Sequence, residues 1–175
     1  LLTMDTNSTT DATSSGKALA APINAKTALH GITATANPTT FDMGNVAGTG
    51  ALATLTAGEL TINNVQILAA AGELDNAAEV AAAINVYTPN TGVVATNPAG
   101  NQIVLTAADG RNIQMVTNGV AAGLTTDNFN MNGGGAGLNQ VQCSTISLNT
   151  ANNLGITVGG TTPGNVGLST GPLRG

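Results

Sequence analysis

Apolar residues recur in this chain with two spacings, and the helical one is clearest in residues 77–85. Val80 and Ile84 are four positions apart in this Ala-rich run, which places both side chains on one face of a helix. Asn76 precedes the run and Glu79 lies three residues further on, an arrangement typical of a capped helix start. The sequence therefore predicts a short helix over 77–85 with an apolar face. A second small-residue run predicts another helix over 17–25.

Alternating apolar and polar residues predict short strands around these helices. The predicted strands are 31–36, 60–62, 65–67, 93–96, 102–106, 112–116, 141–148 and 154–158. Asn63-Asn64 favours a two-residue type I′ hairpin, because Asn tolerates positive φ. Turns are predicted at Pro89–Gly92 and Asp109-Gly110, and connections at Pro38 and Gly44–Gly50.

These elements together predict an α+β fold that is mostly β. Short antiparallel strands and hairpins would carry one or two short Ala-rich helices packed on them, as a repeated unit. Residues 57–117 are expected to form one compact unit, with the helix 77–85 across the strands at 60–67, 93–96 and 102–106. Their alternate apolar residues supply its core: Ile62, Val65, Ile67, Val93, Ile103 and Leu105.

The repeat is visible as two segments that match at one constant offset without a gap. Ile23-Asn24 recurs as Ile84-Asn85, and the glycine that follows recurs as Gly31 and Gly92. Each segment predicts a small-residue helix that ends near Ile-Asn, then a turn, then a strand that begins after the glycine. One supersecondary unit is therefore used twice.

The strings that carry the repeat also resemble a known unit. They include Leu60-Thr61-Ile62-Asn63, Ala82-Ala83-Ile84-Asn85 and Ala108-Asp109-Gly110-Arg111-Asn112-Ile113. These strings resemble the flagellin hook IN unit of bacterial flagellin outer regions and of some hook-associated proteins. The resemblance is dense over 57–117, looser over 17–40 and faint afterwards. Asn64 stands where the family usually has Gly, and both residues suit the turn.

Three segments are expected from this comparison. Residues 1–56 would form a first, degenerate unit, residues 57–125 the hook IN unit, and residues 126–175 a Gly/Asn-rich β segment. The first residues lack the basic start and apolar core of a signal peptide, and the chain does not begin with Met. We therefore expect it to be part of a longer protein, with the terminal helices of flagellins outside it.

Composition narrows the classes of partner. Charged residues make up 7% of the chain, against roughly 25% in typical domains. The four cations, Lys17, Lys26, Arg111 and Arg174, are scattered, which argues against nucleic acid or an anionic membrane as partner. No apolar run is long enough to span a bilayer.

Metal and cofactor sites are not expected. His30 is the only histidine and is interpreted as a turn residue before Gly31. Asn128, Asn130 and Asn132 have the spacing of a calcium loop, and its last ligand position falls on Asn139. Because amides replace every carboxylate, we predict no useful affinity for a divalent cation.

Catalytic residues are not expected either. Gly133–Gly135 lacks the Lys-Ser/Thr of a phosphate loop and is interpreted as a connection. Asp109 and Arg111 are interpreted as a turn followed by a solvated Arg. Cys143 has no partner for an intrachain disulfide and is interpreted as a small buried hydrophobic residue in a strand over 142–146.

The resemblance implies a structural, non-enzymatic protein of the bacterial flagellar filament, outside the cell, whose partners are copies of itself. Its Ser and Thr residues offer sites for the O-linked glycans that flagellins often carry, and Asn7-Ser8-Thr9 is a lone N-linked sequon. Two alternatives remain open at this point: an insertion in a hook-associated or filament-cap protein, or a β-rich extracellular adhesin or binding module.

Overall fold

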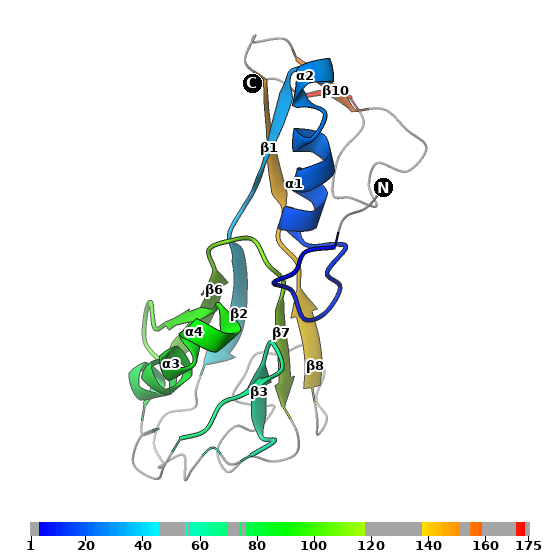
Figure 1. Ribbon diagram of the computed structural model, residues 1–175. Helices are drawn as coiled ribbons and strands as arrows, with labels where there is room; N and C mark the ends of the chain where they lie inside the picture. Colours follow the sequence, from blue (N-terminus) through cyan, green and yellow to red (C-terminus); the bar gives the residue numbers. More distant parts are fainter. Residues whose placement is uncertain are drawn as a thin grey trace.

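The computed structural model describes residues 4–45, 55, 57–69, 74, 76–117, 138–150, 155–158 and 171–173 (Figure 1). Within these residues, short antiparallel strands form small sheets and are accompanied by a few short helices. The predicted α+β class, mostly β, is confirmed.

The first helix–strand unit begins at the N-cap Ser15, whose side chain accepts a hydrogen bond from the N–H of Ala18. Helix α1 (Gly16–Asn24) and the single turn α2 (Thr27–His30) lead into strand β1 (Ile32–Ala36). Gly31 closes α2 in the left-handed conformation, which glycine adopts without a Cβ clash. The helix and strand predicted here are both present.

The second unit repeats this arrangement. Helix α3 (Ala77–Val86) starts at the N-cap Asn76, whose Oδ1 accepts from the N–H of Glu79 at 3.0 Å. The segment predicted as a turn forms the short helix α4 (Thr88–Thr91), because its backbone N–H groups bond back to Tyr87 and Thr88. Gly92 closes α4 in the same left-handed conformation, and β5 (Val94–Thr96) follows.

The two units agree in their side-chain hydrogen bonds as well. Thr27 Oγ1 donates to the C=O of Ile32 at 2.7 Å, and Thr88 Oγ1 donates to the C=O of Val93 at 2.8 Å. Each threonine thus ties the short second helix to the residue after its closing glycine. The constant offset seen in the sequence therefore holds at atomic level.

Strand β5 is one edge of a three-stranded sheet, β2–β6–β5, with β2 at Thr39–Asn45 and β6 at Gln102–Ala107. The hairpin predicted between β5 and β6 is confirmed. A connection was predicted at Pro38 and Gly44–Gly50. Pro38 does lie between β1 and β2, but Gly44 and Asn45 belong to β2, and residues 46–50 lie outside the described residues. Phe41 and Met43 alternate with the exposed Thr40 and Asp42 as a strand requires, and Met43 is the extra residue at a register shift after which Gly44 pairs with Ile103.

A second sheet has the order β4–β3–β7–β8. Its strands are β3 (Leu60–Ile62), β4 (Val65–Gln66), β7 (Ile113–Thr117) and β8 (Leu138–Gln142). The β3–β4 hairpin turns at Asn63 and Asn64, whose φ angles of 48° and 62° are both positive, as the predicted type I′ turn requires.

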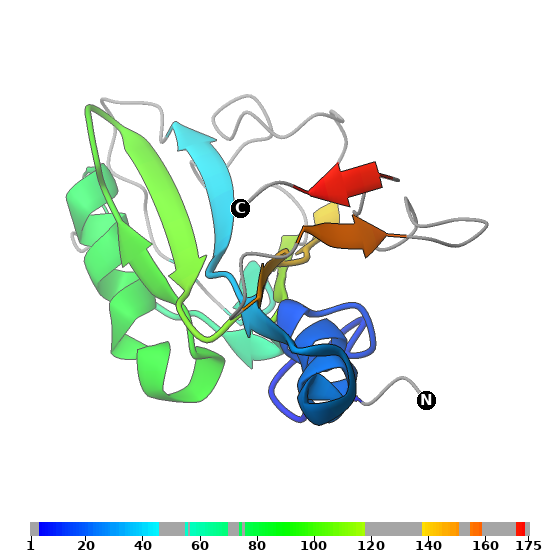
Figure 2. The same ribbon diagram turned by 90° about the horizontal axis from the view of Figure 1, so that it is seen from above.

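One hydrophobic core lies between these two sheets and α3. Its larger members are Phe41, Met43, Leu60, Ile62, Ile67, Val80, Ile84, Val93, Ile103, Leu105, Ile113 and Met115. Helix α3 packs mainly on β5 and β6 (Figure 2). The β3–β4 hairpin, expected in the same layer, belongs to the other sheet and faces the same core.

The first unit is closed by a strand from much later in the chain. Strand β1 pairs with β9 (Ile146–Thr150), placing Ala34 opposite Leu148, just as Ala95 on β5 lies opposite Leu105. Residues predicted as one strand over 141–148 are therefore divided between β8 and β9. Strands β10 (Ile156–Val158) and β11 (Gly171–Leu173) form a further pair.

The chain thus leaves the first unit along β1 into β2 and returns to it from β8 into β9 (Figure 1). The strand pairs β1–β9, β2–β6 and β7–β8 join residues on opposite sides of the predicted boundaries after residues 56 and 125. The strand order places the second unit within the first rather than after it.

Candidate functional site

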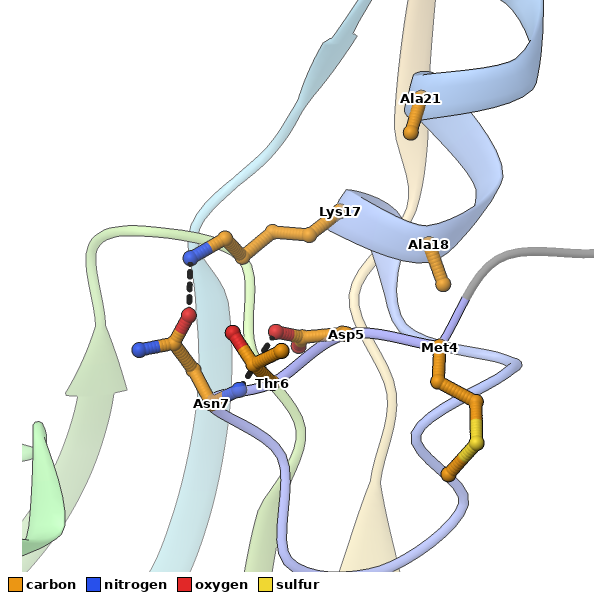
Figure 3. Close-up of a pocket in the computed structure, with 7 residues that line it drawn as sticks. All are labelled: Met4, Asp5, Thr6, Asn7, Lys17, Ala18 and Ala21. Carbon is orange, nitrogen blue, oxygen red and sulfur yellow. Dashed lines mark hydrogen bonds between the residues drawn. The ribbon is translucent and has the colours of Figure 1, made fainter.

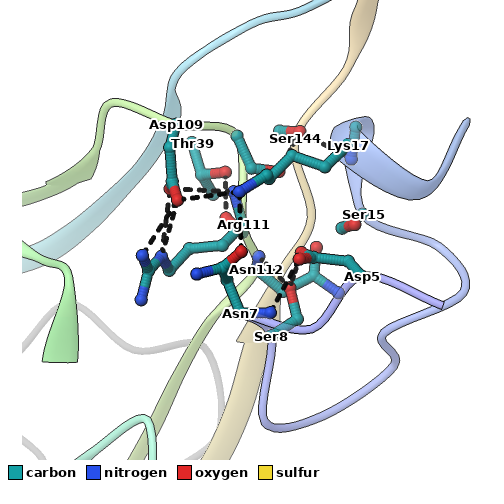
Figure 4. A network of polar contacts seen from close by, with 12 residues as sticks. Asp5, Asn7, Ser8, Ser15, Lys17, Thr39, Asp109, Arg111, Asn112 and Ser144 are labelled. Carbon is teal, nitrogen blue, oxygen red and sulfur yellow. Dashed lines mark hydrogen bonds and ion pairs between the residues drawn. The ribbon is translucent and has the colours of Figure 1, made fainter. Parts of the chain in front are cut away.

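Charged side chains gather where the two units meet, at the corner between β6 and β7 (Figure 4). Asp109 accepts hydrogen bonds from Arg111 Nε at 3.0 Å and Nη2 at 2.9 Å, and from Lys17 Nζ on α1 at 3.2 Å. Lys17 also donates to Asn7 Oδ1 at 2.7 Å. This corner therefore links α1, the N-terminal loop and the β6–β7 turn through one carboxylate.

Arg111 is held on both sides of its guanidinium. Its Nη1 donates to the C=O of Thr91 at the end of α4, at 3.3 Å. A Cβ on Gly92 would come within 2.2 Å of the guanidinium, so the glycine leaves room for it. With its side chain only 17% exposed, Arg111 is not the solvated residue predicted from the sequence. Its partners, Asp109 and Thr91, come from the turn and the second helical unit.

The charge state of Asp109 follows from these contacts. Burial by itself raises the pKa of the carboxyl group, but hydrogen bonds and charge from Arg111, with a hydrogen bond from Lys17, outweigh burial and lower the pKa to about 2. Such a carboxylate stays ionised at neutral pH. It serves there as a hydrogen-bond acceptor and is a poor general base.

Asp5 organises the N-terminal loop against the same corner. Its buried carboxylate accepts from the N–H of Asn7 at 2.8 Å and from Ser8 Oγ at 2.6 Å. Burial raises the pKa of Asp5, but bonds from Ser8, Asn7 and Ser15 and the charge of Lys17 lower it below its ordinary value. The loop is therefore folded around an ionised carboxylate.

Asn112 connects this loop to β7. Its backbone N–H donates to Ser8 Oγ at 2.8 Å, and its Nδ2 donates to the carbonyls of Thr10 and Asp11 at 3.1 and 2.9 Å. The residue is 1% exposed, and its Oδ1 has no hydrogen-bond partner among the described residues. The two carbonyls that accept bonds from Nδ2 fix the orientation of the Asn112 amide, and in this orientation Oδ1 is buried.

Two glycines allow the elements of the corner to approach closely. Gly16 donates its N–H to Ser144 Oγ at 2.8 Å, and Ser144 donates to the C=O of Gly110 at 3.0 Å. A Cβ on Gly16 would overlap Ser144 Oγ, and one on Gly110 would lie 2.7 Å from the Cβ of Ala36. Gly16 thus leaves room for Ser144, which joins the start of α1 to the β6–β7 corner, and Gly110 leaves room for the end of β1.

A shallow cavity of about 340 Å³ opens beside this corner, between the N-terminal loop and α1 (Figure 3). It is lined by Met4, Asp5, Thr6, Asn7, Lys17, Ala18 and Ala21. Lys17 and Asp5, which carry its charges, are both engaged with other residues of the protein. The two charged groups that line the cavity are thus already bonded within the protein.

The remaining residues considered from the sequence have structural surroundings or fall outside the described part. His30, interpreted from the sequence as a turn residue, is the exposed last residue of the short helix α2, and its Nδ1 accepts from the N–H of Ile32 at 3.0 Å. Cys143 is half-buried between β8 and β9, with Sγ 3.6 Å from Ser14 Oγ, so its predicted place inside a strand was wrong.

Asn128, Asn130 and Asn132, which have the spacing of a calcium loop, and Gly133–Gly135 lie outside the described residues. Asn139 is described on β8, where its Oδ1 accepts from Gln114 Nε2 at 2.9 Å. In the described part of the chain, no three His, Cys, Asp or Glu side chains gather closely enough to hold a metal ion. No helix there is long and apolar enough to cross a membrane.

Two kinds of polar contact were not predicted from the sequence. Lys17–Asp109 joins positions 92 residues apart, and nothing local to either residue indicates the other. Asn24 and Asn85 each bond a strand residue ten positions later, at Ala34 and Ala95. These Asn–Ala contacts had a visible signal, because Asn and Ala recur together at the offset of the repeat. The chain matches no known family model, and no curated protein matches it at a significant level.

Proposed function

We propose that this chain is the surface-exposed outer domain of a bacterial flagellin, a structural and non-catalytic component of the flagellar filament outside the cell. One observation supports this more than any other. The Ile-Asn pair of Ala82–Asn85, a string that carries part of the resemblance to the hook IN unit, recurs in both helix–strand units with the same contacts. Asn24 and Asn85 bond the following strand, and Gly31 and Gly92 close the intervening turn.

The chemistry of these residues favours a structural role. Both polar atoms of the Asn85 side chain are bonded to the backbone of Ala95, and Thr88 Oγ1 is bonded to the backbone of Val93. Side chains used in this way hold a fold together and are not available to a substrate. The motif is therefore suited to a repeated building unit of a surface domain.

The proposed partners are copies of the same protein. With 7% charged residues, copies of this surface can lie side by side without strong like-charge repulsion. The Ser and Thr residues would provide attachment points for O-linked glycans. Nucleic acids and membranes are not among the proposed partners, since the cations are few and two of them, Lys17 and Arg111, are engaged with Asp109.

Immunogold electron microscopy tests this proposal. Antibodies raised against purified residues 1–175 are applied to cells that express the full gene, and the same antibodies absorbed with the purified chain are the control. Gold along the whole filament is expected. Gold only at the hook–filament junction or at the tip would favour a hook-associated or cap protein. Gold over the cell body would favour an adhesin.

A further inference from the structure

Asn85 bonds both main-chain polar groups of one strand residue. Its Nδ2 donates to the C=O of Ala95 at 2.9 Å, and its Oδ1 accepts from the N–H of Ala95 at 2.8 Å. Asn24 does the same for Ala34, at 2.8 and 2.7 Å. A side-chain amide has one donor and one acceptor side by side, so it offers a strand the same pair of groups that a neighbouring peptide does.

Both strands lie at the edge of their sheets. In the described part of the chain, β5 pairs only with β6, and β1 pairs only with β9. Ala95 is the middle residue of the three-residue β5, opposite Leu105 of β6. Its N–H and C=O bond Asn85 instead, so they point to the open side of the strand. An added strand would have to bond these same two groups.

The side chains around Ala95 would favour strand addition if these groups were free. Val94 is 45% exposed and Thr96 is also exposed, and both are β-branched residues that suit strands. Open edges with such residues pair readily with the edges of other molecules, and proteins protect them by several devices. On β5 the edge is protected by the side-chain amide of Asn85, on the helix that precedes the strand.

We infer that the side-chain amides of Asn24 and Asn85 protect the open edges of β1 and β5. By bonding the N–H and C=O groups there, they prevent each strand from pairing with the same edge of a second copy of this chain. The repeat supports one role for both residues, because each Asn and the Ala that it bonds recur together in the two units. A simpler role, in which each Asn only fastens a helix to a strand, predicts a loss of stability and no change in association.

The test compares Asn85→Ala with the unsubstituted chain of residues 1–175 by light scattering coupled to size exclusion, over a hundredfold range of concentration. The unsubstituted chain should stay monomeric. N85A should melt at a lower temperature and form dimers or larger species whose fraction rises with concentration. Asn90→Ala, at an exposed position on α4, is the control and should leave both properties unchanged.

A second substitution separates the edge from general destabilisation. Val94→Lys places a charge beside the opened edge, which disfavours strand addition. N85A/V94K should return to a monomer while its melting temperature stays low. Ile84→Val, which removes a buried methyl group from the same helix, should lower the melting temperature without association.

Two results would overturn the inference: an N85A protein that is destabilised but monomeric at every concentration, or N85A/V94K oligomers as abundant as those of N85A. Should N85A fail to fold, the first unit provides the same experiment. Asn24→Ala opens β1, and Thr33→Lys, at the position equivalent to Val94, is then the expected rescue. Monomeric N24A would overturn the inference equally.

Discussion

The ammonium group of Lys17 on α1 lies 3.2 Å from the carboxylate of Asp109 at the β6–β7 corner, although 92 positions separate the two residues. This pair, with Arg111 on the other side of Asp109, joins the start of the first helical unit to a turn of the inserted second unit. One carboxylate at this corner therefore accepts bonds from cations of both units.

Asp109→Asn should reduce the fall in stability that accompanies a decrease in pH in the acid range. The pKa of Asp109 is lowered from 3.8 to about 2. Its contribution to stability is therefore fully present above pH 3.8 and is lost as the pH falls from there through about 2. Because the side chain is 36% exposed, we expect only about 0.5–1 kcal/mol after solvent screening. Melting temperatures of both proteins between pH 7 and pH 2 measure it.

Asp11→Asn is the matched control for that series, since Asp11 is exposed and Asn also tolerates its φ of 51°. Its curve should parallel that of the unsubstituted protein. A D109N curve with an undiminished slope below pH 3.8 would show that Asp109 is not the group responsible.

Ile84→Asp should unfold the second unit. The side chain of Ile84, on α3, is fully buried in the core. An unpaired carboxylate there lowers the free energy of unfolding by several kcal/mol. Val86→Asp lies on the same helix at a position that is 72% exposed, and it should melt within a few degrees of the parent. Circular dichroism melts of the two variants give the comparison. Similar melting of both would mean that the core is placed wrongly.

Glycine substitutions should have unequal costs in the two repeated units. Gly31 and Gly92 both have φ of 70°, so Ala at either position costs about 1–2 kcal/mol for the left-handed backbone. At Gly92 the new Cβ would also displace the guanidinium of Arg111 from Asp109 and Thr91, whereas at Gly31 it meets nothing within 4 Å. We expect G92A to lose roughly 1 kcal/mol more than G31A.

Urea unfolding separates the cost of the left-handed backbone from the cost of displacing Arg111. It is measured for G31A and G92A, each alone and combined with Arg111→Ala. The extra cost of G92A should vanish in the R111A background, because the displaced group is gone. Equal costs for both glycines in the parent background would contradict the crowding at Gly92.

Calcium and zinc titrations by calorimetry should give no binding heat in the micromolar range. The sequence argument is that Asn128, Asn130, Asn132 and Asn139 provide amides where a calcium loop needs carboxylates. Calmodulin titrated under the same conditions is the positive control. A micromolar dissociation constant for either metal would contradict the prediction.

Local features of the fold were readable from the sequence because their physical causes lie within a few residues. Asn76 caps α3 through the N–H of Glu79, three residues away, and Asn63-Asn64 adopts the positive φ angles of its turn. The repeat likewise predicted a helix followed by a strand in both units, although the segment predicted as a turn between them forms the short helices α2 and α4. In these cases the residue that determines the conformation and the conformation itself are neighbours along the chain.

Strand β2 shows where such reasoning failed. Pro38 and Gly44 indicated a connection, yet Phe41 and Met43 are buried and Gly44 itself pairs with Ile103 of β6, with Met43 as the extra residue of a register shift. Local propensity was outweighed by the apolar area that a strand could bury at this place. That area exists only because β6, some sixty residues later, lies alongside.

The sequence by itself determined the fold class, the two helix–strand units and the turn residues that close them. The tertiary structure alone decided that β9 rather than a nearer strand completes the first unit, and that Lys17, Asp109 and Arg111 meet. It also decided that Asn24 and Asn85 bond edge strands. Capping and turn preferences act over a few residues, whereas strand pairing and ion pairing depend on distances in space that spacing along the chain does not encode.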